Sequence, residues 1–110
     1  MFVAMNRFSV VSGKERAFEA LWFGRETHLE RVPGFIAFHL MRGPSIDGGT
    51  LYASHTTWNS RAGFEAWTRS DAFRAAHKDR WDSEGLYMGR PKLELFDSLQ
   101  AVTAAAAEPA

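Results

Sequence analysis

The stretch TLYASHTTWNSRAGFEAW, residues 50–67, contains the signals that decide the fold. Its first part is rich in β-branched and aromatic side chains, and this composition predicts a strand over residues 50–58. Asn59 or Ser60 then provides the side chain that caps the first turn of a helix. We therefore expect a strand that leads directly into a helix.

The continuation TRSDAFRAAH predicts a break in this helix at Ser70 and Asp71, followed by a second helical segment to about His77. Ser and Asp favour helix caps over helix interiors, because their side chains compete for backbone hydrogen bonds. In one unbroken helix, Trp67 and His77 would lie roughly 80° apart around the axis and ~15 Å apart along it. Both side chains could therefore touch a broad, flat ligand but not a small one.

The stretch FVAMNRFSV, residues 2–10, predicts the first strand. Under the two-residue period of a strand, Asn6 shares one face with four apolar residues. These are Phe2, Ala4, Phe8 and Val10. A buried amide left without a hydrogen bond costs roughly 1–3 kcal/mol. Asn6 is therefore either bonded to a neighbouring backbone group or directed into a cavity.

The remaining elements follow from caps, breakers and apolar runs. Ser12 and Glu15 have the spacing of a capping box and predict a helix that runs to about Arg31, before Pro33. The apolar residues 34–42 predict a strand covered on both faces. The rest of the chain is expected to form a turn-rich connection at 43–49, a loop at 78–91, a last strand at 92–100 and a disordered tail at 101–110.

The resulting order, β-α-β-β-α-β, predicts one domain of the α+β class with the ferredoxin-like fold. Two helices can cover only one face of its antiparallel sheet. The other face would expose apolar side chains, and a second copy of the same sheet would cover them, so we predict a homodimer. Depending on register, that face carries the following residues or their alternates: Val3, Met5, Ile36, Phe38, Leu40 and Tyr52.

Composition excludes several functional classes. The formal net charge is +0 and no cluster of Lys and Arg stands out, so we expect no nucleic-acid partner. Without cysteine, the chain forms no disulfide and has no thiolate metal ligand or cysteine nucleophile. Asn6 and Arg7 interrupt the first apolar run, and no run approaches the ~18 apolar residues of a membrane span. We therefore expect a cytoplasmic protein without a membrane partner.

The histidines do not form a known zinc motif. They are His28, His39, His55 and His77. Because none belongs to an H-x-x-x-H or H-E-x-x-H pattern, a zinc site made by the protein alone is not expected. A single imidazole can still hold haem iron, which brings four ligands of its own. From the residues alone, His77 is either a packed helix-end histidine or such a ligand, and Trp67 is either a core residue or a ligand contact.

Taken together, Asn6, Trp67 and His77 resemble the set that marks the small haem-degrading monooxygenases of bacteria, the non-canonical haem oxygenases. These belong to the antibiotic-biosynthesis monooxygenase superfamily, whose members form dimeric α+β barrels from ferredoxin-like subunits. The stretch TTWNSRAGFEAWTRSDAFRAAH, residues 56–77, resembles that superfamily more broadly. The resemblance covers residues 1–100 and implies a domain of this kind.

The resemblance implies a role for each member of the set. His77 would be the axial ligand of the haem iron. Asn6 would donate a hydrogen bond on the opposite side of the haem, to the oxygen bound there. Trp67 would press on the porphyrin and buckle it, which brings a meso carbon towards that oxygen. Each role suits the chemistry of the side chain, since an amide donates and a neutral imidazole commonly ligates haem iron.

The pocket lining is expected to include further aromatic residues. Phe23, Phe64 and Phe73 are candidates to stack on the ring or to line its edge. Haem propionates require cations or solvent, and the candidate cations are Arg25, Lys78 and Arg80.

The implied reaction needs haem as both cofactor and substrate, together with O2 and an external electron donor. The chain has no flavin or nicotinamide motif, so the electrons must come from another reductant or reductase. The implied products are iron and a bilin-type pigment. Three alternatives remain open on this fold, because fold does not determine function. They are a cofactor-independent quinol or anthrone monooxygenase, a haem carrier or sensor without enzymatic activity, and a dimeric stress-response domain with a filled core.

Overall fold

The computed structural model describes residues 1–25, 28–76 and 85–104. Within them, four strands form one sheet in the order β2-β3-β1-β4, and each neighbouring pair is antiparallel. The elements are β1 (Phe2–Val11), α1 (Glu15–Phe23), the 3-10 helix η1 (Leu29–Arg31), β2 (Phe35–Ile46), β3 (Gly49–Trp58), α2 (Arg61–Thr68), α3 (Asp71–Ala76) and β4 (Lys92–Asp97). This order and topology confirm the predicted ferredoxin-like α+β fold.

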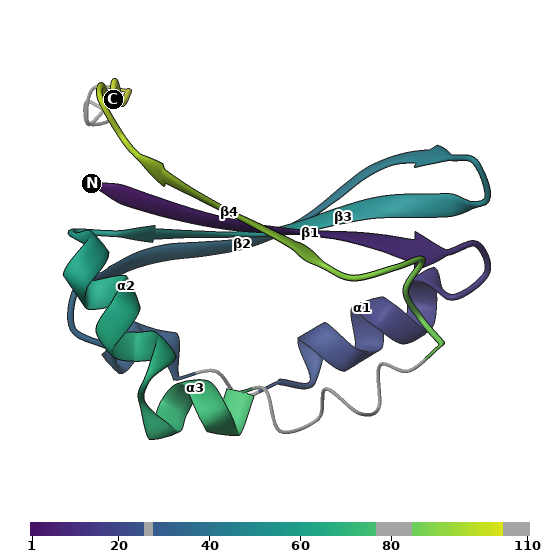
Figure 1. Ribbon diagram of the computed structural model, residues 1–110, viewed down its shortest axis with the longest axis horizontal. Helices are drawn as coiled ribbons and strands as arrows, with labels where there is room; N and C mark the ends of the chain where they lie inside the picture. Colours follow the sequence, from purple (N-terminus) through teal and green to yellow (C-terminus); the bar gives the residue numbers. More distant parts are fainter. Residues whose placement is uncertain (26–27, 77–84, 105–110) are drawn as a thin grey trace, which may run out of the picture.

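The helices α1, α2 and α3 lie on one face of the sheet (Figure 1). The side-chain alternation of β1 explains this arrangement, because Arg7 and Ser9 are exposed whereas the apolar set on the alternate positions is buried. That buried set consists of Phe2, Ala4, Phe8 and Val10, as predicted. Asn6 has the same parity and therefore lies on the helix-covered face.

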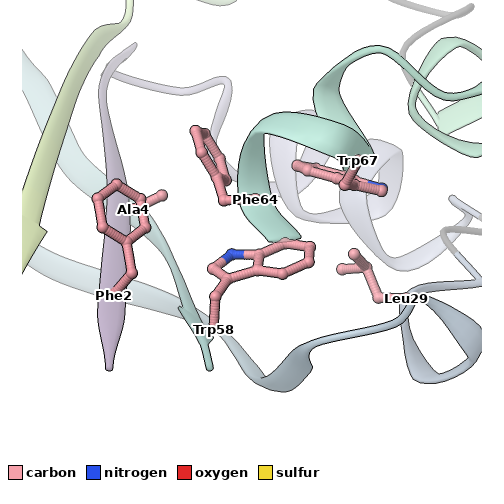
Figure 2. Packing of buried hydrophobic residues seen from close by; sticks show 6 residues of the cluster. All are labelled: Phe2, Ala4, Leu29, Trp58, Phe64 and Trp67. Atoms are coloured by element: carbon pink, nitrogen blue, oxygen red, sulfur yellow. The ribbon is translucent and has the colours of Figure 1, made fainter. Parts of the chain in front are cut away.

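Two separate aromatic clusters form the core between the helices and the sheet. The first cluster, shown in Figure 2, contains Phe2, Ala4, Leu29, Trp58, Phe64 and Trp67. The second cluster contains Phe8, Val10, Phe18, Tyr52 and Leu86. Burying a large apolar side chain stabilises a fold by about 1.5–3 kcal/mol, so these clusters are the main source of stability. Along β1 the boundary between the clusters falls at Asn6.

The opposite face of the sheet, here called the outer face, carries the alternate residues of each strand. Val3 and Met5 lie there half-buried, as predicted, and Met5 pairs with His55. Tyr52 instead pairs with Phe8 and lies on the helix-covered face, so the register places its alternates Leu51 and Ala53 on the outer face. Phe38 and Leu40 also lie on the helix-covered face, because they pair with Thr56 and Ser54. The alternates on the outer face are Ala37, His39, Met41, Leu51 and Ala53, with Phe96 from β4.

The first helix is shorter at both ends than predicted. It begins at Glu15, and Lys14 rather than Ser12 is the N-cap. The Glu15 carboxylate accepts from the backbone N–H of Gly13 at 3.0 Å, and the backbone N–H groups of Glu15 and Gly13 hold the pKa of this carboxyl below its usual value. The helix ends at Phe23 because Gly24 forms its C-cap, and the chain then enters η1 rather than continuing as helix to Arg31.

The connection between the second and third strands is shorter than predicted. β2 extends to Ile46, and a tight turn at Asp47 and Gly48 joins it to β3. Both turn residues have positive φ, 50° and 81°, which is the backbone that an Asp-Gly hairpin favours. Pro44 is tolerated inside β2 because this strand is at the sheet edge and its register shifts between Arg42 and Ser45.

The described part of the predicted loop at 78–91 packs against the sheet. Residues 78–84 lie outside the described residues, but Leu86 is buried and Tyr87 forms a β-bridge with Val10. The backbone N–H of Val11 donates to the Leu86 carbonyl at 2.8 Å. The last strand, β4, ends at Asp97 rather than at residue 100.

Candidate active site

The candidate site is built around Asn6, in the middle of β1. Asn6 pairs with Ser54 of β3 on one side and with Leu93 of β4 on the other. Its Oδ1 is buried and has no hydrogen-bond partner among the described residues. Rotation about the terminal torsion exchanges the two ends of the amide, so either an acceptor or a donor can occupy this position. A buried, unpaired amide oxygen between two aromatic clusters suits a ligand that is mainly apolar and has one polar centre.

Aromatic side chains of α2 and α3, which belong to the first cluster or pack against it, form one side of this site. Trp67 is 9% exposed, and its ring centroid lies 5.4 Å from that of Trp58 (Figure 2). Phe73 of α3 packs edge-on against Trp67, with centroids 4.8 Å apart. Phe64 lies 6.2 Å from Trp67. The structure thus places three of the predicted contact residues together, and their packing restrains the Trp67 indole.

The break between α2 and α3 lies where the sequence predicts it. α2 ends at Thr68, and α3 begins at Asp71. Ser70 caps α3, because its Oγ accepts from the backbone N–H of Phe73 at 3.2 Å. His77 is the next residue in the chain after α3 and lies outside the described residues, so its predicted role stays a prediction.

Trp22 of α1 faces the site from the second cluster's side, and the sequence analysis missed it. Its ring centroid lies 5.4 Å from that of Phe8 and 6.0 Å from that of Phe38, on which it stacks with an interplanar angle of 12°. Its Nε1 is buried and has no hydrogen-bond partner among the described residues. The available signal was its spacing from the apolar Phe18, one helical turn earlier.

The predicted contact residue Phe23 points away from this region, since it is 75% exposed. Arg25, a predicted partner of propionates, places its guanidinium carbon 4.5 Å from the Trp22 ring centroid, in a cation–π contact. Lys78 and Arg80 lie outside the described residues. The positive charge that the structure does place near the site therefore comes from Arg25.

A polar contact ties α1 to the sheet beside the site. The Tyr52 hydroxyl donates to the Glu19 carboxylate, and Arg42 donates to the same carboxylate at 3.4 Å. Burial, reinforced by the hydrogen bond to Glu19 and its negative charge, raises the pKa of Tyr52 to about 12. Tyr52 therefore stays a neutral phenol at physiological pH, and the Glu19 charge is neutralised by Arg42 rather than directed at a ligand.

The described part of the chain contains no group of three or more His, Asp or Glu side chains that could hold a metal ion. His39 and His55 face each other on the outer face, with ring centroids 6.1 Å apart. Two imidazoles are too few for a structural zinc site.

Fold and site together define an α+β domain with its candidate site between the helices and the sheet. Residues 1–79 match the family model described as antibiotic biosynthesis monooxygenase. The chain belongs to this monooxygenase family. No helix in the described ranges has the length and hydropathy needed to cross a membrane.

Relatives and solved structures place the chain more narrowly within the family. It is 32% identical, over 73% of its length and 76% of the relative's, to a haem oxygenase (staphylobilin-producing) of Staphylococcus haemolyticus (strain JCSC1435). It is 36% identical, over about half of each chain (50% and 51%), to a haem-degrading monooxygenase of Bacillus thuringiensis (strain Al Hakam). The structure of the haem degrader MhuD from Mycobacterium tuberculosis, with two haems bound in its active site, superposes with a TM-score of 0.72 at 28% identity, covering 94% of this chain and 100% of MhuD.

Proposed function

We propose that this protein is a haem-degrading monooxygenase. It opens the porphyrin ring of haem with O2 and external electrons, and it releases iron and a bilin-type product. The similarity to haem-degrading relatives supports this proposal. The observation that carries it is the buried, unpartnered Oδ1 of Asn6 between two aromatic clusters.

The chemistry of this region matches haem as the substrate. The macrocycle is flat and apolar, and aromatic side chains bind such surfaces well. Its polar centre is the iron, which supplies the site at which O2 reacts. The single Asn6 amide on the sheet provides one hydrogen-bonding group for that centre. The apolar residues around the amide exclude water from it. Asn6 thus orients the oxygen side of the substrate.

We assign the opposite side of the haem to His77. A neutral imidazole is a common axial ligand of haem iron. The capped break at Ser70 supports this assignment, because it gives α3 a direction independent of α2. The two halves of the broken helix can therefore present Trp67 and His77 to one broad ligand.

In this proposal, Trp67 is the rigid side chain that contacts the porphyrin ring and distorts it. Trp58 and Phe73 both pack on the indole, and Leu29 belongs to the same cluster. A restrained indole yields less than a mobile side chain would, so contact with it favours distortion of the macrocycle. Phe64 and Phe73 complete the aromatic wall.

The outer face supports assembly as a homodimer. Met5 and Val3 are only half-buried in the single chain, and Phe96 is 48% exposed beside them. An apolar sheet face of this kind requires a cover, and a second copy supplies a surface of the same shape. A separate reductant or reductase delivers the electrons.

Titration with hemin, followed by addition of ascorbate under air, tests this function. We expect a Soret band that saturates at one haem per subunit, then bleaching of the band with release of iron. Saturable binding without bleaching would instead identify a carrier or sensor. No Soret shift, together with O2 uptake on addition of an aromatic diol, would identify a cofactor-independent quinol monooxygenase.

A further inference from the structure

A pair of histidines lies on the outer face of the sheet, on the side opposite the proposed haem site. His39 of β2 pairs directly with His55 of β3, and their ring centroids lie 6.1 Å apart at an interplanar angle of 63°. Neither imidazole has a hydrogen bond or an ion pair with the described part of the chain. In the single chain His39 is exposed and His55 is half-buried. The ring nitrogens of both side chains are therefore available to a ligand.

The spacing of the two rings suits a shared metal ion. Imidazole nitrogens bind zinc at about 2.0–2.1 Å, so two imidazoles on one ion have ring centroids about 5–6.5 Å apart. The separation of 6.1 Å between His39 and His55 falls within this range. The final torsion of a histidine side chain is broad, so each ring can turn a nitrogen towards the ion. The pair can therefore supply two ligands to one metal without movement of the strands.

The neighbours of the pair do not provide other partners of this kind. In the same row of the sheet, Met5 of β1 comes next to His55, and Glu94 of β4 comes next to Met5. The Glu94 carboxylate already accepts from Arg7, and this ion pair also neutralises the cation closest to the row. The neighbours on the same face of β2 and β3 are Ala37, Met41, Ala53 and Thr57. Apart from the Thr57 hydroxyl, their side chains have no oxygen or nitrogen.

The second copy that covers the outer face in the proposed homodimer supplies the missing ligands. Two sheets that pack face to face lie about 10 Å apart, so an ion midway between them is within reach of imidazoles from both. His55 belongs to β3, one of the two inner strands, so the pair extends under the interior of the interface. Two-fold symmetry brings the same patch from each copy. Two imidazoles thereby become four, which is the ligand number of a structural zinc site.

We propose that His39 and His55 of both copies hold one zinc ion between the two outer faces, and that this ion stabilises the dimer. Without a metal, closure of the interface would leave these imidazoles buried and unpaired, at a cost of roughly 1–3 kcal/mol for each. An ion that binds the dimer but not the monomer shifts the equilibrium towards the dimer. This inference rests on the proposed homodimer but does not take haem as the ligand.

The test titrates zinc into metal-free protein, prepared with a chelator and without hemin, and measures the dimer dissociation constant by sedimentation. Zinc should saturate at one ion per two chains and should lower the dissociation constant about tenfold or more. His39→Gln and His55→Gln keep a polar side chain and should each remove both effects. His28→Gln, which changes a histidine outside the sheet, should behave as the wild type. Hemin binding by His39→Gln should also match that of the wild type.

Two results would overturn the shared site while leaving the homodimer in place. One is a dissociation constant that does not change with zinc, and the other is zinc that binds at one ion per chain or equally well to His39→Gln. A wild type that stays monomeric with and without zinc would refute the site and the homodimer together. The hemin titration would then still test the proposed reaction independently. Thermal unfolding without zinc, expected to be similar for the variants and the wild type, verifies that they fold.

Discussion

Asn6 of β1 pairs with Ser54 of β3 on the helix-covered face of the sheet, yet its buried Oδ1 has no hydrogen-bond partner among the described residues. Selection for stability alone would favour an apolar side chain at position 6. Because the unsatisfied amide lies where the two aromatic clusters meet, we interpret it as a group reserved for the substrate.

Replacing Asn6 by Leu should separate stability from activity. The substitution removes an unsatisfied polar atom and keeps a similar volume, so the free energy of unfolding should be unchanged or increase by up to about 1 kcal/mol. Hemin should still bind, but ascorbate-driven bleaching should slow about tenfold or more, because an oriented donor is lost. Ser54→Ala is the neighbouring control and should bleach at the wild-type rate. An Asn6→Leu variant that bleaches haem as fast as the wild type would contradict the role of Asn6.

His77→Ala should abolish the axial ligation of the haem iron. The Soret and visible bands of the hemin complex should change to those of a weakly bound haem without an imidazole ligand, and free imidazole should restore the original bands in part. His28→Ala is the control, since His28 is exposed and lies in the turn before η1. An unchanged spectrum in His77→Ala, with or without imidazole, would remove His77 from the site.

Trp67 should prove important for both stability and turnover, and two substitutions distinguish these roles. Trp67→Ala removes an indole that is 9% exposed and packed on Trp58 and Phe73, and should cost about 3–5 kcal/mol of unfolding free energy. Trp67→Phe should fold and bind hemin but bleach it more slowly. Chemical denaturation and single-turnover bleaching measure the two effects. Wild-type bleaching by Trp67→Phe would refute the role of the indole as a wall.

The outer face should mediate dimerisation. Met5→Asp places a charge at the centre of this half-buried apolar face and should convert a dimer into a monomer. Arg16→Glu, on the exposed surface of α1, should leave the dimer intact. Size-exclusion chromatography with light scattering measures the mass. A wild-type monomer, or a dimer that persists in Met5→Asp, would contradict this assembly.

Tyr52 should make stability depend on pH in the alkaline range. Its pKa is about 12 in the folded protein and about 10 in an unfolded chain. The raised pKa means that its stabilising contribution is complete below pH ~10 and is lost as the pH rises towards 12. Urea unfolding of the wild type and of Tyr52→Phe should therefore converge in stability between these pH values. A stability difference that stays constant over this range would show that Tyr52 is not the group responsible.

Local patterns were sufficient to predict the element order, the face of the sheet on which Asn6 lies and the break between α2 and α3. The two-residue period of β1 placed Asn6 among buried apolar residues, and the cap preference of Ser70 located the helix break. Both signals are local, because strand alternation and capping depend on residues only a few positions apart. Strand pairing, by contrast, is a long-range property. The sequence could not show that Tyr52 and Phe38 lie on the helix-covered face.

The limits of the sequence signal were clearest in the first helix. The capping pattern suggested Ser12 and an end near Arg31, whereas Gly24 ends the helix at Phe23. Within this helix Trp22 packs against the sheet, whereas Phe23 is exposed. Which of two adjacent aromatic residues points inward depends on how the helix rotates against the sheet, and that rotation is set by tertiary packing.

The most direct test of the central claim is the ratio of iron released to haem bleached in a single turnover. Purified protein is loaded with one equivalent of hemin and reduced with ascorbate under air, with catalase present to remove free peroxide. A ferrous chelator then reports the iron. The account predicts loss of the Soret band with close to one iron released per haem and formation of a bilin-type pigment. A Soret band that persists under these conditions, or bleaching that catalase prevents, would contradict it.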